Sequence, residues 1–405
     1  MIGMRGLDRR LPASEVPWRP GEEIVRIVAR EWKRSGWVEL KLQGRQIESV
    51  CERPGPVEPS PGDLWVAPAF WDLQINGRWG HSFSSPELTV DQVVEIVRAQ
   101  AALGTSRLCP TLISAELEAM RHGLRTIAEA CERFPEVAAM VLGIHLEGPF
   151  LSDRDGYRGA HPPAALRDPD WTLFTGLQEA SGQRIILITL APERAGAIPF
   201  IERATKSGVV VALGHTAADG PTIRRAVDAG ARLSTHLGNG IAQELPRHPN
   251  PIWHQAAEDR LWASLIADGH HLDADTLRVL VRAKGPPRIL LVSDASPLSG
   301  LPVGTYGAWE VHPSGKILVT GTPYLAGSNL PLGPCLGNFL EVSGEPLRVA
   351  IETVTSQPAR LLGREPPELR PGAAANLILF RRPRQNHLEL RQCCVDGIWH
   401  EVSTG

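Results

Sequence analysis

The sequence predicts an α/β protein: a parallel (β/α)8 TIM-type barrel, with a small sheet built from both ends of the chain beside it. The middle of the chain alternates apolar runs with amphipathic stretches, which is typical of parallel β/α construction. Both ends instead show short alternating runs broken by proline and glycine. Ionisable residues stand where several apolar runs end, and this agrees with a barrel because its active sites lie at the carboxyl ends of its strands.

The first and last elements are expected to be short β-strands. Residues 24–28 and 37–42 alternate apolar and polar side chains, and a proline-rich stretch follows them. Residues 376–380 and 394–399 have the same β character after a Pro-Gly turn. We therefore expect residues 1–66 and 371–405 to form one discontinuous small β domain, and residues 67–370 to form the barrel.

The barrel strands are expected at eight apolar runs. These runs are 68–76, 106–114, 138–148, 184–192, 208–216, 231–239, 261–271 and 288–296. Amphipathic helix candidates between them are 90–103, 116–133, 195–207, 221–229 and 274–283. An open doubly wound sheet would use the same alternation, but no Gly-x-Gly-x-x-Gly follows the first run, so the barrel is favoured.

Composition argues against several classes of protein. The 42 Lys and Arg nearly balance the 45 Asp and Glu, for a net charge of −3, which does not suit a nucleic-acid-binding surface. No apolar run reaches the roughly 18 residues that a membrane-spanning helix needs. The six cysteines form no Cys-x-x-Cys pair, which fits a reducing compartment. The first residues lack the apolar segment of a signal peptide, so we expect a cytoplasmic protein.

Ionisable residues gather at the ends of the apolar runs. They are His145, Glu147, His215, His236, His270, His271 and Asp294. A carboxylate and two imidazoles at the mouth of a barrel form the ligand set of a catalytic divalent metal ion with one position open for water. Zinc is the usual occupant, although manganese, iron and cobalt are compatible with the same ligands. Asp294 is placed to accept a proton from that water and to return it to a leaving group.

Three of these histidines have other interpretations. His145 shares a strand face with Glu147, so it is a ligand, a hydrogen-bond partner of the ligands or a buried core residue. We favour the last two. His270 and His271 are adjacent, so only one of them can point inward, and the other is solvated or caps a helix.

Seven motifs occur along the chain in one order. They are Gly-Ile-His-Leu-Glu-Gly-Pro-Phe-Leu (143–151), Thr-Leu-Ala-Pro-Glu (189–193), Gly-His-Thr (214–216), Thr-His-Leu-Gly-Asn (235–239), Ile-Ala-Asp-Gly-His-His (266–271), Val-Ser-Asp-Ala (292–295) and Leu-Ala-Gly-Ser (325–328). This ordered set, over about residues 66–380, resembles the N-acetylglucosamine-6-phosphate deacetylases of the amidohydrolase superfamily. The resemblance implies a (β/α)8 barrel with a small β-sandwich domain formed by both termini, hydrolysis of a small-molecule amino sugar phosphate, and a homodimer.

The resemblance also assigns roles to single residues. It implies that Glu147, His215 and His236 bind one divalent metal ion, with Zn²⁺ the first candidate, and that Asp294 is the general base and then the general acid. The superfamily's common His-x-His pair is replaced here by Gln-Ile-Asn at 74–76. Amides are much poorer zinc ligands than imidazole, so a second metal ion is not expected.

Further positions match substrate contacts of the family. They are Ala160, His161, Asn239, Gly240, Arg247, His271, Leu325, Ala326 and Gly327. His161 is implied to polarise the acetamide carbonyl alongside the metal. Arg247 matches the arginine that holds the sugar phosphate, a role that suits a planar guanidinium fork, and a neighbouring subunit can complete this phosphate site.

Some features depart from the family pattern. The loop at 247–254 is richer in proline and aromatic residues than expected, and Trp71, Trp79 and Trp253 add bulk near possible entry loops. Pocket contacts set specificity whereas the metal centre sets the class of reaction, so these departures leave the substrate open. The alternatives are another N-acetylated amino sugar, an N-acyl or cyclic amide, and, from a different class, a metal-free barrel that serves as a binding protein.

Overall fold

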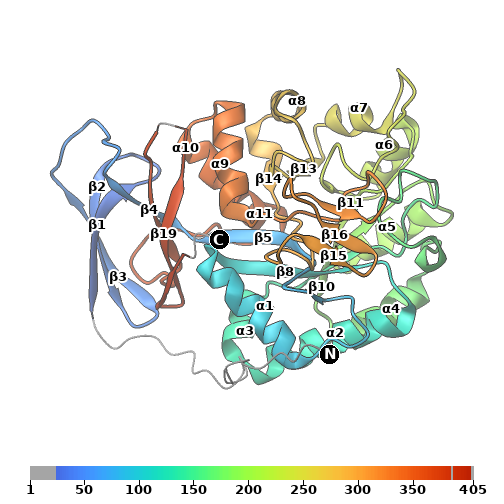
Figure 1. Cartoon of the computed structure of the whole chain (residues 1–405), viewed down its shortest axis with the longest axis horizontal. Helices are drawn as coiled ribbons and strands as arrows, with labels where there is room; N and C mark the ends of the chain where they lie inside the picture. Colours follow the sequence, from blue (N-terminus) through green and yellow to red (C-terminus); the bar gives the residue numbers. More distant parts are fainter. Residues whose placement is uncertain (1–23, 385, 403–405) are drawn as a thin grey trace.

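The computed structural model describes residues 24–384 and 386–402, which form a barrel and a separate sheet beside it (Figure 1). The N-terminal residues on which the cytoplasmic prediction rests lie outside these ranges. Within the described ranges, no helix combines the length and the apolar character needed to cross a membrane.

Eight parallel strands form the barrel; seven lie within the predicted apolar runs, and β8 begins one residue before its run. Their bounds are β5 Phe70–Ile75, β8 Thr105–Ile113, β9 Ile144–Glu147, β10 Ile185–Leu190, β11 Val210–Leu213, β12 Leu233–Ser234, β13 Trp262–Leu265 and β14 Ile289–Leu291. They pair in chain order from β5 to β14. The Asn76 N–H donates to the Ala295 carbonyl at 2.9 Å beside a parallel Ile75–Ala295 bridge, so the first strand meets the segment after the last. The predicted fold class is confirmed.

The predicted helices are all present. They are α1 Val90–Ala102, α2 Leu117–Arg133, α5 Ala197–Lys206, α6 Gly220–Asp228 and α8 Ala274–Lys284. Further helices that the sequence patterns do not predict are α3 Pro135–Met140, α4 Trp171–Ala180, α7 Pro251–Ala256, α9 Leu332–Ser343, α10 Leu347–Thr353 and α11 Ser356–Leu361. Several of these are a turn or two long, and α9 contains Gly333, Pro334 and Gly337, so burial rather than intrinsic propensity stabilises them.

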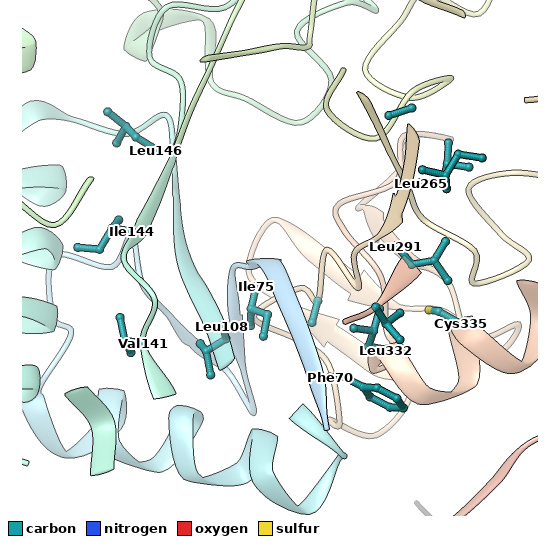
Figure 2. Close-up of a cluster of buried hydrophobic side chains, with 14 of the residues drawn as sticks. Phe70, Ile75, Leu108, Val141, Ile144, Leu146, Leu265, Leu291, Leu332 and Cys335 are labelled. Carbon is teal, nitrogen blue, oxygen red and sulfur yellow. The ribbon is translucent and has the colours of Figure 1, made fainter. Parts of the chain in front are cut away.

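Two buried apolar clusters occupy the wall of the barrel, so polar side chains with chemical roles are confined to its rim. Aliphatic residues of the strands pack with α9 in one buried cluster, in which Figure 2 labels Phe70, Ile75, Leu108, Val141, Ile144, Leu146, Leu265, Leu291, Leu332 and Cys335. Alternate strand residues, including Leu73, Leu187 and Leu290, form a second buried cluster. Because successive residues of a strand face opposite sides, both faces of the barrel wall are apolar along much of their length.

The separate sheet joins the two ends of the described chain. Its seven strands lie in the order β20-β19-β18-β4-β1-β2-β3. Their bounds are β1 Val25–Glu31, β2 Trp37–Gln43, β3 Gln46–Arg53, β4 Leu64–Pro68, β18 Leu377–Arg381, β19 Glu389–Val395 and β20 Ile398–Glu401. β4 and β18 pair antiparallel and connect the early strands to the late ones, which lie side by side at the left of Figure 1. The exact domain boundaries stay a prediction.

One expected strand differs in detail. The run at 394–399 contains the turn between β19 and β20, because Asp396 and Gly397 have φ values of 48° and 80°. Two consecutive residues in this left-handed region are what a two-residue hairpin turn requires.

A buried carboxylate lies at the seam where the barrel closes. Asp72 of β5 is 1% exposed, and its Oδ1 accepts hydrogen bonds from the backbone N–H groups of Gln74 (3.3 Å) and Ser293 (3.2 Å). Burial outweighs these hydrogen bonds and raises the pKa of Asp72 to about 7. The folded protein therefore retains a proton that the unfolded chain releases near its ordinary value of 3.8.

Asp72→Asn is expected to make stability less sensitive to pH. In the wild type the raised folded-state pKa lowers the free energy of unfolding as pH rises from about 4 to about 7, by roughly 3 kcal/mol between pH 5 and pH 8. Asparagine keeps an acceptor oxygen and carries no charge. Urea unfolding at both pH values should show the variant gaining stability relative to the wild type at pH 8. Parallel pH profiles would contradict a protonated Asp72.

Candidate active site

Three side chains from three strands converge at the carboxyl-terminal rim of the barrel. Glu147 ends β9, while His215 and His236 follow β11 and β12. The Nε2 atoms of His236 and His215 lie 2.9 Å and 3.4 Å from the same atom, Oε1 of Glu147. All three side chains are buried, and their ligand atoms lie within 4.8 Å of one another. The structure thus brings together the three residues predicted as metal ligands, and it contains a possible metal site.

Hydrogen bonds hold the two histidines in different ways. The backbone N–H of His236 donates to Ser264 Oγ at 2.7 Å and fixes the chain that carries the ring, whereas the ring of His215 is itself oriented, because its Nδ1 lies 3.0 Å from the carbonyl oxygen of Tyr157. A carbonyl can only accept, so Nδ1 of His215 carries a proton and its Nε2 is available as a metal ligand. That Nε2 faces an oxygen of Glu147, and the two atoms need a proton or a cation between them. The donor set therefore fits a divalent metal ion.

The charges at the rim agree with this fit. Burial alone would raise the pKa of Glu147, but hydrogen bonds from His215 and His236 outweigh it and hold the pKa well below its ordinary range. An ionised carboxylate with two imidazole nitrogens is a common zinc-binding combination, and other divalent ions accept the same atoms.

Asp294 lies beside this group and is held by two amides. Gln74 Nε2 donates to Asp294 Oδ1 at 3.0 Å and to Glu147 Oε1 at 3.1 Å, and Asn76 Nδ2 donates to Asp294 Oδ1 at 2.7 Å. Burial, with the nearby charge of Glu147, raises the pKa of Asp294 to about 6. A carboxyl group with this pKa can both accept and return a proton near neutral pH. Gln74 and Asn76 thus act as hydrogen-bond donors within the site.

The other singled-out histidines lie in different surroundings. His145 is buried with its Nε2 2.8 Å from Thr189 Oγ1, and it is not part of the convergent ligand group found among the described residues. This agrees with the favoured interpretation. Of the adjacent pair His270 and His271, it is His271 that lines the cavity, with its Nδ1 2.8 Å from Asp268 Oδ2.

A cavity of about 260 Å³ opens over these groups. All but one of the predicted substrate contacts line it: Ala160, His161, Asn239, Gly240, His271, Leu325, Ala326 and Gly327. Arg247 is exposed and is not among the lining residues. Gly240 lies so close to His215 that an added Cβ would stand 2.7 Å from Nδ1, which accounts for glycine at this position.

The sequence patterns do not reveal two aromatic residues of the cavity wall. Trp309 lies on β16 (Trp309–Val311), between β15 (Gly304–Tyr306) and β17 (Ile317–Val319) in a three-stranded sheet, and Tyr324 follows that sheet. The sheet lies in the connection after the eighth barrel strand. The strands of this sheet are three residues long, which is too short to show a recognisable alternation of apolar and polar side chains. The aromatic character of Trp309 and Tyr324 is therefore the only sequence feature that could indicate a cavity wall here.

The sequence of this chain was also compared with those of known proteins. No family model matches the chain. The N-acetylglucosamine-6-phosphate deacetylase of Bos taurus is 37% identical over 316 residues, which are 75% of this chain and 76% of that protein. This extent of similarity decides the family. The chain belongs to the N-acetylglucosamine-6-phosphate deacetylases.

Other members of this family and its neighbours extend the similarity. The N-acetylgalactosamine-6-phosphate deacetylase of Escherichia coli O157:H7 is 31% identical over 369 residues, 89% of this chain and 95% of that protein. A structure from Mycobacterium smegmatis, a mutant of N-acetyl-D-glucosamine-6-phosphate deacetylase in complex with N-acetyl-D-glucosamine-6-phosphate, has a TM-score of 0.80 at 29% identity, with 90% of this chain and 94% of that chain covered. The barrel deacetylase fold is therefore shared along nearly the whole described chain.

Glu147→Ala is expected to abolish stoichiometric metal binding. Its Oε1 is the atom on which both histidines converge, so its loss should weaken metal affinity by at least the roughly 100-fold that follows loss of a supporting group around a metal ligand. Metal analysis after dialysis, with a thermal melt with and without added Zn²⁺, measures this. Glu365→Ala, an exposed position, is the control. Wild-type metal content in the Glu147 variant would contradict the assignment.

Proposed function

We propose that this protein hydrolyses the acetamide of N-acetylglucosamine 6-phosphate to glucosamine 6-phosphate and acetate. The convergence of Glu147, His215 and His236 beside Asp294, all of which line one cavity, carries this proposal. The named activities of the similar proteins support the choice of substrate. N-acetylgalactosamine 6-phosphate is a second candidate, because the relative named for it matches 89% of the chain.

Metal binding and proton transfer are assigned to different residues. Glu147, His215 and His236 would hold one divalent ion, with zinc the first candidate; a bound ion of this kind lowers the pKa of water and polarises a carbonyl oxygen. Asp294 is ionised at neutral pH given its pKa of about 6. Both amides engage its Oδ1, so Oδ2 is the oxygen that takes the proton of the attacking water.

The same carboxyl group completes the reaction. The oxygen of water forms a new bond to the acetamide carbon, the carbon–nitrogen bond breaks, and Asp294 gives its proton to the departing amine. Acetate and the free amino sugar result. His161, which lines the cavity, is placed to donate a hydrogen bond to the carbonyl oxygen as negative charge develops on it.

Asp294→Asn is expected to lower kcat for acetate release from N-acetylglucosamine 6-phosphate by roughly 100- to 10,000-fold, because the general base is lost. Metal content should stay at the wild-type level, since Asp294 lies outside the three-residue ligand group. An acetate assay alongside metal analysis measures both quantities. Near-normal turnover would contradict the role of Asp294, and a metal-free, inactive wild type would favour the binding-protein alternative.

We also propose that Arg247 binds the sugar phosphate from one subunit of a homodimer into the site of the other. Its exposed position outside the cavity of a single chain supports this arrangement. The charge of a guanidinium suits phosphate, and the near-balanced overall charge of the protein gives no support to a nucleic-acid partner. The cytoplasmic location stays a prediction.

Arg247→Ala is expected to raise KM for N-acetylglucosamine 6-phosphate by about 10- to 100-fold, the loss expected for one or two charge-assisted hydrogen bonds. Activity on unphosphorylated N-acetylglucosamine should not change. Steady-state kinetics on both sugars measures the contrast, with Arg26→Ala on the separate sheet as the control. Equal losses on the two sugars would rule out a phosphate contact.

A further inference from the structure

The imidazole of His161 is hydrogen-bonded at one nitrogen by a residue from another strand end. Ser114 follows β8, and its backbone N–H donates to His161 Nδ1 at 3.3 Å. The Ser114 hydroxyl oxygen lies 3.0 Å from the same nitrogen. Ser114 and His161 are 1% and 4% exposed, so water does not compete for these contacts.

The chemistry of the donor decides the state of the ring. A backbone N–H can donate but cannot accept, so Nδ1 of His161 must present its lone pair to Ser114. A neutral imidazole with an unprotonated Nδ1 carries its hydrogen on Nε2. Within the described part of the chain, the hydrogen bonds of the His161 ring are made at Nδ1, and the side chain lines the cavity.

The neighbouring ligand shows the opposite arrangement. The rings of His161 and His215 pack edge to face with centroids 4.5 Å apart. Nδ1 of His215 faces a backbone carbonyl, that of Tyr157, whereas Nδ1 of His161 faces a backbone N–H. The two backbone groups therefore set opposite tautomers in adjacent rings: His215 keeps a lone pair on Nε2, and His161 keeps a hydrogen there.

We propose that Ser114 is a positioning residue that locks His161 as the Nε2–H tautomer, so that His161 donates a hydrogen bond to the acetamide oxygen of the substrate. This inference rests on the proposed deacetylation and deepens it. His161 retains its proton throughout the reaction, while the proton of the attacking water travels through Asp294. The same tautomer keeps His161 out of the metal ligand set, because a protonated Nε2 has no lone pair for a cation.

The first test is the tautomer itself. The full-length, metal-loaded protein is labelled with ¹⁵N-histidine, and two-bond ¹H–¹⁵N correlation spectra are recorded. The signals of His161, among the 13 histidines, are identified by their loss in His161→Gln. We expect a protonated Nε2 and an unprotonated Nδ1. A protonated Nδ1 in the wild type would overturn the proposal.

A matched pair of substitutions tests the role of Ser114. Ser114→Asp places a carboxylate, which only accepts, at the position of the hydroxyl that lies 3.0 Å from Nδ1, and its charge should outweigh the longer 3.3 Å contact from the backbone N–H and draw the hydrogen to that nitrogen. Ser114→Asn has nearly the same size, so it controls for crowding near Gly148, and its amide can still donate. We expect the Asp variant to show the reversed tautomer and a kcat about 100-fold below that of the Asn variant, the usual cost of one lost donor to an oxyanion. KM and metal content should be similar in the two.

The results separate this inference from the proposed function. An unchanged tautomer in Ser114→Asp would overturn control of the ring by the Ser114 side chain, and equal kcat values despite a reversed tautomer would overturn the link between tautomer and turnover; both results leave the deacetylation intact. The tautomer is read without turnover, so a wild type that releases no acetate would contradict the proposed function even with His161 in the expected state. If both variants fail to fold, the wild-type spectrum still decides the tautomer.

Discussion

The site depends on one buried oxygen atom, Oε1 of Glu147. Nε2 atoms of His215, His236 and Gln74 all lie within 3.4 Å of it. A buried carboxylate is costly unless opposite charge or several donors compensate it, and here they come from three other strand ends. Removing any one of them leaves the charge less compensated. Gln74 bonds Glu147 and Asp294 at once, so the candidate metal ligands and the proposed general base lie side by side.

The barrel supplies these groups through the places where its strands stop. His215, His236 and Asp294 each stand two or three residues beyond a strand, and each has a positive φ, of 49°, 30° and 49°. Residues with a Cβ seldom adopt this region, and such strain is kept where the surrounding packing enforces it. The two apolar layers of the barrel wall provide that enforcement. The turn after each strand aims the side chain across the rim, toward the atoms contributed by other strands.

Periodicity and position predict much of this arrangement. The apolar runs locate all eight strands, and ionisable residues at the run ends identify the convergent group and Asp294. Features that arise between distant segments escape such patterns. Ser114 is an ordinary residue at the end of its run, and its importance comes from a loop histidine 47 residues later. Trp309 lies on a strand too short to show alternation, α9 carries helix-disfavouring residues that burial offsets, and Arg247 lies exposed outside the cavity of a single chain.

Reaction class and sugar identity are encoded in different parts of the molecule. In the proposed reaction, the groups that act on the acetamide are Glu147, His215, His236, Asp294 and His161. N-acetylglucosamine 6-phosphate and N-acetylgalactosamine 6-phosphate share that group and the phosphate, and they differ only in the configuration of one ring carbon. The metal centre therefore cannot distinguish the two sugars. The two sugars must therefore be distinguished by other residues of the cavity wall. Trp309 and Tyr324 belong to this wall, and they lie in a sheet and loop inserted after the eighth strand. Such an insertion can change without disturbing the barrel, so one chemistry can serve both sugars.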